Sequence, residues 1–233
     1  MQFAVVATPS RIADRVVCCA LARSSLLACL AAPTAQPPPP PQLNMLISQK
    51  GLSLGCSVDL YEHGLQSATR CYRDLKTSTL PDATGLTASG LSVADEELVV
   101  VALLHDIGET LSPVNHGEVA ASVLRPYISP QNYWILNHHE IFQSFYYGEA
   151  AGINHKLRDE LKSSPHWDAC ERFCLLWDQT AFDGDYDFEP LSFFVPMVER
   201  VLAKPAYAHP AHKEEHINQL KATMGGAYPT EVA

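Results

Sequence analysis

The sequence is short of positive charge. Its 233 residues include 16 lysines and arginines against 26 aspartates and glutamates, which gives a formal net charge of -10 at pH 7. Proteins that bind nucleic acid neutralise the phosphate backbone with patches of lysine and arginine, so this balance disfavours nucleic acid as a partner. A small anionic substrate is not excluded, because one local positive centre such as a metal ion can hold it.

Several other signals are missing as well. No stretch reaches the roughly 20 apolar residues that a membrane-spanning helix needs, so we expect no membrane partner. Seven cysteines are present, yet no two are spaced as CxxC, which argues against a zinc ribbon or a thioredoxin-like motif. This cysteine usage indicates a reduced, intracellular protein. Cys170 and Cys174, four residues apart in a helical pattern, are expected to be small buried apolar residues.

Residues 1–45 differ in composition from the rest of the chain. They carry three arginines, one aspartate and no other charged residue, and the proline run 37–41 lies near their end. An arginine-bearing, acid-poor leader rich in alanine and serine is typical of an organellar transit peptide. Two other interpretations stay open: a disordered extension or misplaced gene start, and a secretory signal around the apolar run LLACLAA. The prolines predict a stiff, extended linker, so we expect the folded domain to begin near residue 50.

Beyond the leader the hydrophobic period is helical, strand signals are weak and no internal repeat occurs. Ser92 is a candidate N-cap, and Ser129 followed by Pro130 marks another helix start. The helices are expected at residues 58–75, 92–108, 115–127, 129–142, 166–182 and 190–205, with a surface loop at 77–93. The sequence therefore predicts an all-α helical bundle over residues 50–205, followed by a C-terminal tail at 206–233.

The most informative stretch is ALLHDIG, where His105 and Asp106 are adjacent at the end of a very apolar helix. An aspartate buried there without a partner would be costly, and a cation is the economical solution. Further histidines and another aspartate lie within or at the margins of predicted helices: His63, His116, His138, His139 and Asp178. The ends of packed helices can meet around one cavity, so we expect these side chains to converge on a metal site.

Imidazole combined with carboxylate suits iron, manganese or zinc. Two such metals joined by a shared carboxylate can position a substrate and either activate water or bind dioxygen. The residue types alone therefore indicate metal-dependent chemistry, and they leave the choice among these metals open.

The motifs also resemble a known family. LLHDIG, together with the upstream EHGLQSA and the downstream NH, HH and WD, is similar to the HD-domain superfamily of metal-dependent phosphohydrolases and oxygenases. The similarity runs over about residues 57–205. Within that superfamily, YEHGLQSATR, NHGEVAASVLRPYIS, NYWILNHHEIFQ and WDQTAFD resemble the mixed-valent diiron oxygenases that cleave carbon–phosphorus bonds in hydroxylated aminophosphonates. The resemblance implies an HD-domain helical bundle.

The same resemblance implies four histidines and two aspartates around two iron ions, Fe(II) and Fe(III), although other divalent metals can bind such residues. The matching positions are His63, His105, Asp106, His116, one of His138 and His139, and Asp178. Asp106 would bridge the two metals, and Asp106 and His105 would be central to catalysis. Within the HH pair, His138 is the expected ligand and His139 is expected beside it.

Two positions depart from the family pattern. Phosphonate oxygenases of this kind carry a glutamate shortly before the first histidine, where this sequence has Cys56. A lysine found in some members four residues after the fourth histidine would fall on Phe142. The remaining candidates for substrate contacts are polar residues near the expected site: Arg125, Gln143, Tyr146 and Tyr147.

Three functions are compatible with these observations. The one we expect is an oxygenase of phosphonate catabolism, which uses dioxygen to cleave the C–P bond of a small hydroxylated organophosphonate and releases phosphate. The alternative is a metal-dependent phosphohydrolase of nucleotides or phosphomonoesters, which needs lysine or arginine near the phosphates. The sequence offers Arg125 for this role but no basic cluster. A third hypothesis is a metal-binding domain without enzymatic activity.

Overall fold

The structure is a computed structural model, and it describes residues 40–53, 55–79 and 84–203. These residues form helices and connecting turns without any strand, so the prediction of an all-α fold is confirmed. The α-helices are α2 (Pro41–Ile47), α3 (Leu60–Ser78), α4 (Val93–Leu104), α5 (His116–Leu124), α6 (Pro130–Ala151), α7 (Trp167–Phe173) and α8 (Leu191–Leu202). A short 3₁₀ helix, η1 (Leu157–Leu161), precedes α7, and a π-helical turn, η2 (Cys174–Asp178), follows it.

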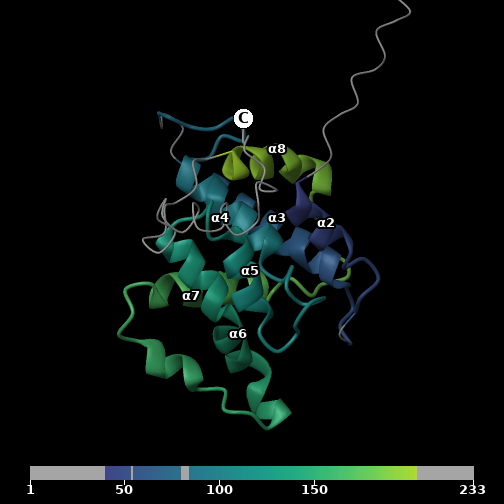
Figure 1. The fold of residues 1–233 in the computed structure, drawn as a ribbon, viewed down its shortest axis with the longest axis vertical. Helices are drawn as coiled ribbons and strands as arrows, with labels where there is room; N and C mark the ends of the chain where they lie inside the picture. Colours follow the sequence, from purple (N-terminus) through teal and green to yellow (C-terminus); the bar gives the residue numbers. More distant parts are fainter. Residues whose placement is uncertain (1–39, 54, 80–83, 204–233) are drawn as a thin grey trace, which may run out of the picture. The chain divides into compact units, whose positions relative to one another are not determined.

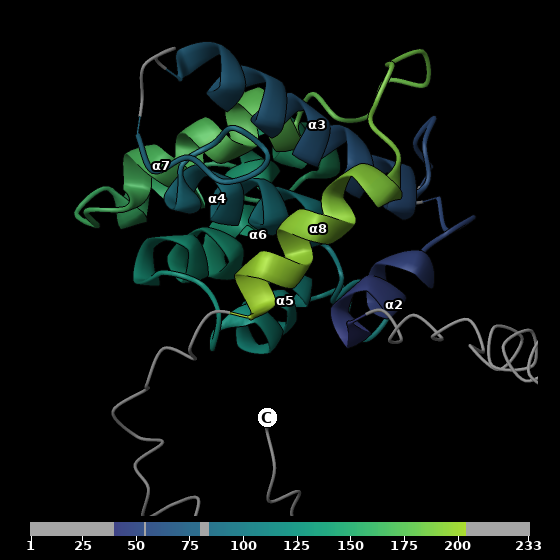
Figure 2. The same ribbon diagram turned by 90° about the horizontal axis from the view of Figure 1, so that it is seen from above.

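Helix α4 lies at the centre of the bundle. Its second half is apolar on every side, and residues 99–104 are each at most 1 % exposed. A helix with this composition must be covered all round. Helices α3 and α8 both pack against α4 (Figures 1 and 2), and α2 and α6 also contact it. The C-terminal end of α4, where His105 and Asp106 follow, is therefore placed inside the protein.

The helix starts follow the capping residues in the sequence. The hydroxyl of Ser92 accepts a hydrogen bond from the amide of Asp95, and α4 begins one residue after Ser92, as predicted. Ser129 caps α6 in the same way, with Pro130 in the first turn. Such caps stabilise a helix start because they satisfy amides that have no partner within the helix. The two predicted starts are confirmed.

Several helix ends differ from the prediction. Helix α6 continues nine residues beyond the expected end at residue 142 and stops at Gly152, whose φ of 71° is a left-handed conformation that favours glycine. Helix α3 likewise runs to Ser78, into the segment expected to be a loop. The helix predicted over 166–182 is divided, because the amide of Gln179 bonds to the carbonyl of Cys174 and so closes a π-helical turn.

The segment before residue 50 also differs from the prediction. Residues 41–47 form helix α2 instead of an extended linker, and Leu43 and Leu46 are each 1 % exposed. A proline in the first turn of a helix is well tolerated, because its missing amide would have no partner there. The packed region therefore starts before residue 50. The rest of the leader, residues 1–39, and the tail at 206–233 lie outside the described residues.

The structure also bears on membrane association. None of the helices in the described ranges combines the length and the apolar character that crossing a lipid bilayer requires.

Candidate metal centre

The carboxylate of Asp106 faces a different group of histidines with each of its oxygens. Its Oδ2 atom lies 3.3 Å from Nε2 of His105 and 3.4 Å from Nε2 of His63. Its Oδ1 atom lies 3.1 Å from Nε2 of His116 and 3.1 Å from Nε2 of His139. One carboxylate thus connects two clusters of potential ligands, as a bridging group would.

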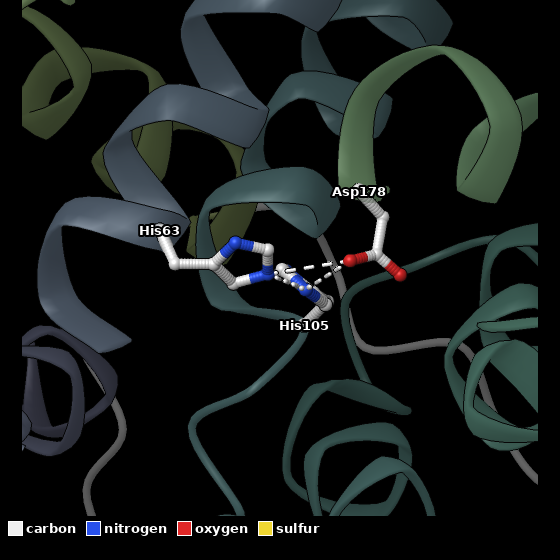
Figure 3. A group of neighbouring side chains, drawn as sticks. All are labelled: His63, His105 and Asp178. Atoms are coloured by element: carbon white, nitrogen blue, oxygen red, sulfur yellow. Dashed lines mark hydrogen bonds and ion pairs between the residues drawn. The ribbon is translucent and has the colours of Figure 1, made fainter. Parts of the chain in front are cut away.

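The first cluster consists of His63, His105 and Asp178, which converge from α3, the end of α4 and the π-helical turn (Figure 3). The Nε2 atoms of His63 and His105 lie 3.0 Å apart. Oδ1 of Asp178 lies 3.3 Å from Nε2 of His63 and 3.6 Å from Nε2 of His105. All three side chains are at most 2 % exposed. Asp178 is the last residue of the π-helical turn η2, and this turn places its side chain in the interior.

The second cluster consists of His116 at the start of α5 and His139 in the middle of α6. Their Nε2 atoms lie 3.1 Å apart. Helices α5 and α6 approach closely here because Gly117 has no side chain. A Cβ atom on Gly117 would lie 2.5 Å from the carbonyl oxygen of Leu136. A larger residue at this position would force the backbone of the two helices to shift where the two histidines meet.

All four histidines turn the same ring nitrogen towards the centre. Each Nδ1 atom lies within hydrogen-bond distance of a backbone carbonyl. The distance is 3.0 Å from His63 to Ala181 and 2.9 Å from His105 to Ala102. It is 3.2 Å from His116 to Pro113 and 2.7 Å from His139 to Leu136. A carbonyl that accepts a hydrogen bond from Nδ1–H keeps the proton on Nδ1 and so leaves the lone pair on Nε2. Metal ligands are commonly oriented in this way.

The spacing of the donor atoms fits metal ions. With metal–ligand bonds of about 2.1 Å, neighbouring donors lie about 3.0 Å apart in an octahedral site and about 3.4 Å apart in a tetrahedral one. The separations of 3.0–3.6 Å within the first cluster lie within about 0.2 Å of this range. In addition, Oδ2 of Asp178 is buried without a hydrogen-bond partner. Imidazole and carboxylate donors suit a divalent iron, manganese or zinc ion.

The electrostatics of the cluster favour positive charge beside its carboxylates. Burial lowers the pKa of His105, but Asp106 and Asp178 outweigh this effect and raise the pKa to about 10. The pKa of His116 is lowered by burial too, and Asp106 and Glu109 raise it to about 11. Burial raises the pKa of Asp106 and of Asp178, yet the neighbouring imidazoles hold both below their usual range. Protons or metal ions can neutralise such buried carboxylates, and the two compete.

A cavity of about 710 Å³ opens onto both clusters. Val58, Leu60 and Phe182 give part of its wall an apolar surface, and Glu109, Glu140 and Gln143 line another part. Among the described residues that line it there is no lysine or arginine. A small anionic molecule in this cavity would therefore have to meet its positive charge at the metal positions.

The order that we expected within the HH pair is reversed. Nδ1 of His138 contacts the carbonyl of Trp134 at 2.8 Å, and its ring stacks on the Trp134 indole with centroids 4.1 Å apart. Adjacent residues on an α-helix point about 100° apart, so only one of the two histidines can face the centre. The inward residue is His139, which is 1 % exposed. The structure brings together the other expected ligands, and leaves His138 outside the cluster.

The four candidate substrate contacts divide into two pairs. Gln143 and Tyr147 line the cavity, and Nε2 of Gln143 donates to Oδ1 of Asp178 at 3.2 Å. Arg125 and Tyr146 do not line it. The Arg125 guanidinium lies over the ring of Tyr133, 5.1 Å from its centroid, and Tyr146 packs near Arg158 instead. Cys56 lines the cavity, whereas Phe142 is fully buried in the core.

Some residues of the site were not anticipated from the sequence. The ring of Phe182 stacks on His63 with centroids 4.2 Å apart. Gln49, which is fully buried, donates from Nε2 to the carbonyl of Asp106. Glu109 and Glu140 both approach Nδ1 of His116. The sequence held a signal for the two glutamates only, because Glu109 follows Asp106 by three residues and Glu140 is adjacent to His139.

Comparison with known families agrees with this geometry. Residues 72–163 match the family model of the HD domain. The matched range includes His105, Asp106, His116 and His139, whereas His63 and Asp178 lie outside it. No curated protein matches the chain. The family match supports the HD-domain superfamily, the broader part of the resemblance in the sequence, and with it a metal-dependent enzyme with a His/Asp site.

Proposed function

With an HD domain as the premise, we propose that this protein is a two-metal enzyme in which Asp106 bridges the metal ions. The observation that carries the proposal is the position of the Asp106 carboxylate. One oxygen faces His63 and His105, and the other faces His116 and His139. A single-metal site would use only one of these clusters. The imidazoles of the other cluster would then face Asp106 without acting as metal ligands.

We propose further that the two metals are iron, as Fe(II) and Fe(III), and that the enzyme is an oxygenase. Its substrate would be a small hydroxylated organophosphonate, and the reaction would consume dioxygen, cleave the C–P bond and release phosphate. The support for this finer proposal is the resemblance of the motifs around His63, His116 and His139 to phosphonate oxygenases. With His139 as the inward histidine, the position four residues later is Gln143 instead of Phe142.

The residues of the chain have separate roles in this proposal. When bound, the metal pair would supply Lewis acidity and the exchange of electrons with dioxygen. Asp106 holds the two ligand clusters together, and Gln143 orients Asp178 through its hydrogen bond. Val58, Leu60 and Phe182 present apolar surface to the cavity and exclude water from that side. The protein thus provides ligand geometry, orientation and a partly dry cavity.

The second candidate is a metal-dependent phosphohydrolase, and the HD-domain match itself favours it. A nucleotide substrate would need lysine or arginine near its phosphates. Arg125, the residue that we considered for this role, lies against Tyr133 and outside the cavity, and among the described residues that line the cavity there is no lysine or arginine. A small phosphomonoester, held by the metals alone, is the form of this alternative that remains.

One experiment separates the two candidates. The protein is purified anaerobically, its metal content is measured, and phosphate release is followed with and without dioxygen. The substrates are a hydroxylated aminophosphonate and p-nitrophenyl phosphate. An oxygenase releases phosphate from the phosphonate only with dioxygen, and shows the paramagnetic resonance signal of a coupled mixed-valent iron pair. Release from the phosphate ester at equal rates in both atmospheres would replace the oxygenase by a phosphohydrolase.

A further inference from the structure

We propose that Glu109 and Glu140 act as positioning residues, which form a carboxylate clamp on His116 and thereby create the second metal position. The proposal rests on the two-metal function above. Oε1 of Glu109 lies 2.9 Å from Nδ1 of His116, and Oε1 of Glu140 lies 3.5 Å from the same atom. Nδ1 of His116 also lies 3.2 Å from the carbonyl of Pro113. Among the four inward histidines of the described chain, no other Nδ1 atom lies this close to a carboxylate; the other three contact backbone carbonyls.

The two clusters differ in the number of carboxylates beside their histidines, and the clamp adds negative charge to the cluster that has fewer. The first cluster has Asp178 as a second carboxylate that faces Nε2 of both histidines. The second cluster has only the shared oxygen of Asp106 in front of His116 and His139. Negative charge behind His116 makes its ring more basic and a stronger ligand. The glutamates thus supply negative charge to the second cluster at Nδ1 of His116, whereas Asp178 supplies it to the first cluster at the Nε2 atoms.

The local backbone is built to bring Glu109 against His116. The amide of Glu109 closes a turn onto the carbonyl of Asp106, at 3.0 Å. At the apex of this turn, Gly108 touches the start of α5, and a Cβ atom there would lie 2.2 Å from the carbonyl oxygen of His116. The Glu109 side chain is 9 % exposed, and its Oε2 atom is buried without a hydrogen-bond partner. A purely structural glutamate would be expected to use both oxygens.

Glu140 supports the same imidazole from the neighbouring helix. It follows the inward His139 on α6, and its Oε1 atom also accepts a hydrogen bond from the amide of Gly117, the residue after His116. The side chain is 26 % exposed, so solvent weakens its interaction with His116. We therefore expect Glu109, which is closer and more buried, to make the larger contribution.

The test measures metal binding by the full-length protein instead of catalysis. Metal-free wild type and the variants Glu109→Gln, Glu140→Gln and Glu118→Gln are titrated anaerobically with Fe(II) and, in parallel, with Co(II), whose visible spectrum reports the coordination. Glu118 is the matched control, because it is an exposed glutamate on α5. Circular dichroism and thermal unfolding of the metal-free proteins check that each variant is folded. Glu109→Asp serves as the conservative variant.

The expected result is a selective loss at one metal position. Wild type should bind two equivalents, and Glu109→Gln should bind the first normally but the second about 10 to 100 times more weakly. Glu140→Gln should weaken the second equivalent less, Glu109→Asp should restore part of the affinity, and Glu118→Gln should match wild type. In a His116→Ala background, Glu109→Gln should have no additional effect, since the two act through one ligand.

Two failures can be told apart. If wild type binds fewer than two equivalents, the two-metal function itself is wrong. If wild type binds two equivalents and both Glu109→Gln and Glu140→Gln bind the second as tightly as wild type, the clamp is wrong while the two-metal site stands. Should Glu109→Gln not fold, Glu109→Asp and Glu140→Gln decide: unchanged second-equivalent affinity and Co(II) spectrum in both would overturn the clamp.

Discussion

The side-chain amide of Gln49 donates a hydrogen bond to the backbone carbonyl of Asp106, at 2.5 Å. This bond joins the second residue after helix α2 to the residue that faces both ligand clusters. Gln49 is fully buried, and 57 positions in the sequence separate it from Asp106. Helix α2 is therefore part of the support of the site and not a connection that leads into the domain.

Replacement of Gln49 should lower the free energy of unfolding. Gln49→Leu removes the donor but leaves the bond from the amide of Glu109 to the same carbonyl, so we expect a loss of about 1 kcal/mol in the free energy of unfolding. Gln49→Glu buries an acid against a carbonyl and should cost about 3 kcal/mol. Urea unfolding of the metal-free proteins measures these effects, with the exposed Ser48→Ala as control. Wild-type stability in Gln49→Glu would contradict the role of this bond.

The sequence predicted most of the fold but not this part, for a physical reason. Helix α2 has seven residues with two buried leucines, which is too short to display a helical period, and the proline run that ends at its first residue resembles a linker. By contrast, α4 begins at a clear N-cap and continues through an apolar run that must be buried. Long periodic segments and caps are local signals, whereas the docking of a short helix depends on tertiary contacts.

The same distinction applies to the site. The HD pair and the other ligand types could be predicted from local sequence and family resemblance. The inward residue of the HH pair could not, because α6 is covered by aromatic and aliphatic residues around much of its circumference, from Tyr133 to Phe142, and this leaves its rotation undefined. The π-helical turn before Asp178 and the contact between Phe182 and His63 likewise depend on packing.

The two histidines of the HH pair should therefore behave differently when replaced. His139→Ala removes an inward imidazole, and we expect it to lose the metal ion of the second cluster. His138→Ala removes the stacking on Trp134, which should lower the free energy of unfolding by about 1 kcal/mol but leave two metal equivalents bound. Elemental analysis after anaerobic reconstitution gives the stoichiometry. Loss of metal in His138→Ala with retention in His139→Ala would restore the opposite assignment.

Asp106 is the residue whose loss should affect both metals. Asp106→Ala removes the oxygens that face His63 and His105 on one side and His116 and His139 on the other. We expect this variant to bind neither metal tightly and to have no activity. His155→Ala, which changes a histidine outside both clusters, should retain metal and turnover. Two tightly bound equivalents in Asp106→Ala would show that another group bridges the ions.

The close approach of the turn after Asp106 to helix α5 can be tested at Gly108. A Cβ atom at this position would lie 2.2 Å from the backbone carbonyl of His116, and backbone cannot move aside as a flexible side chain can. Gly108→Ala should therefore lower the free energy of unfolding by about 1–3 kcal/mol and weaken the second metal equivalent. Gly184→Ala is the control, since its Cβ would meet only ordinary contacts at 3.8 Å and beyond. Equal stabilities of the two variants would contradict the steric argument.

The ion pair between Glu96 on α4 and Arg200 on α8 predicts a dependence of stability on pH that does not involve the metal site. Nη2 of Arg200 lies 2.6 Å from Oε1 of Glu96, and Nε lies 3.0 Å from Oε2. Burial raises the pKa of Glu96, which is 3 % exposed, but the hydrogen bonds from Arg200, Ser89 and Thr87 outweigh it and lower the pKa below its ordinary value. The folded state thus favours the charged form more than the unfolded state does.

The sign of the effect follows from that direction. Because the pKa of Glu96 is lower in the folded protein, its contribution to stability is fully present above its unfolded pKa of about 4.3 and is lost as the pH falls through its folded pKa. We expect Glu96→Gln to be less stable than wild type by about 1–3 kcal/mol at neutral pH, a figure reduced because the Arg200 side chain is more than one third exposed. Urea unfolding of both metal-free proteins, from about pH 7 to about pH 3.5, measures the difference in their free energies of unfolding. Titration of the site carboxylates is common to both proteins and cancels in this difference. The difference should therefore shrink towards the acid end of the range. A difference that stays constant over the whole range would show that Glu96 does not hold the two helices through its charge.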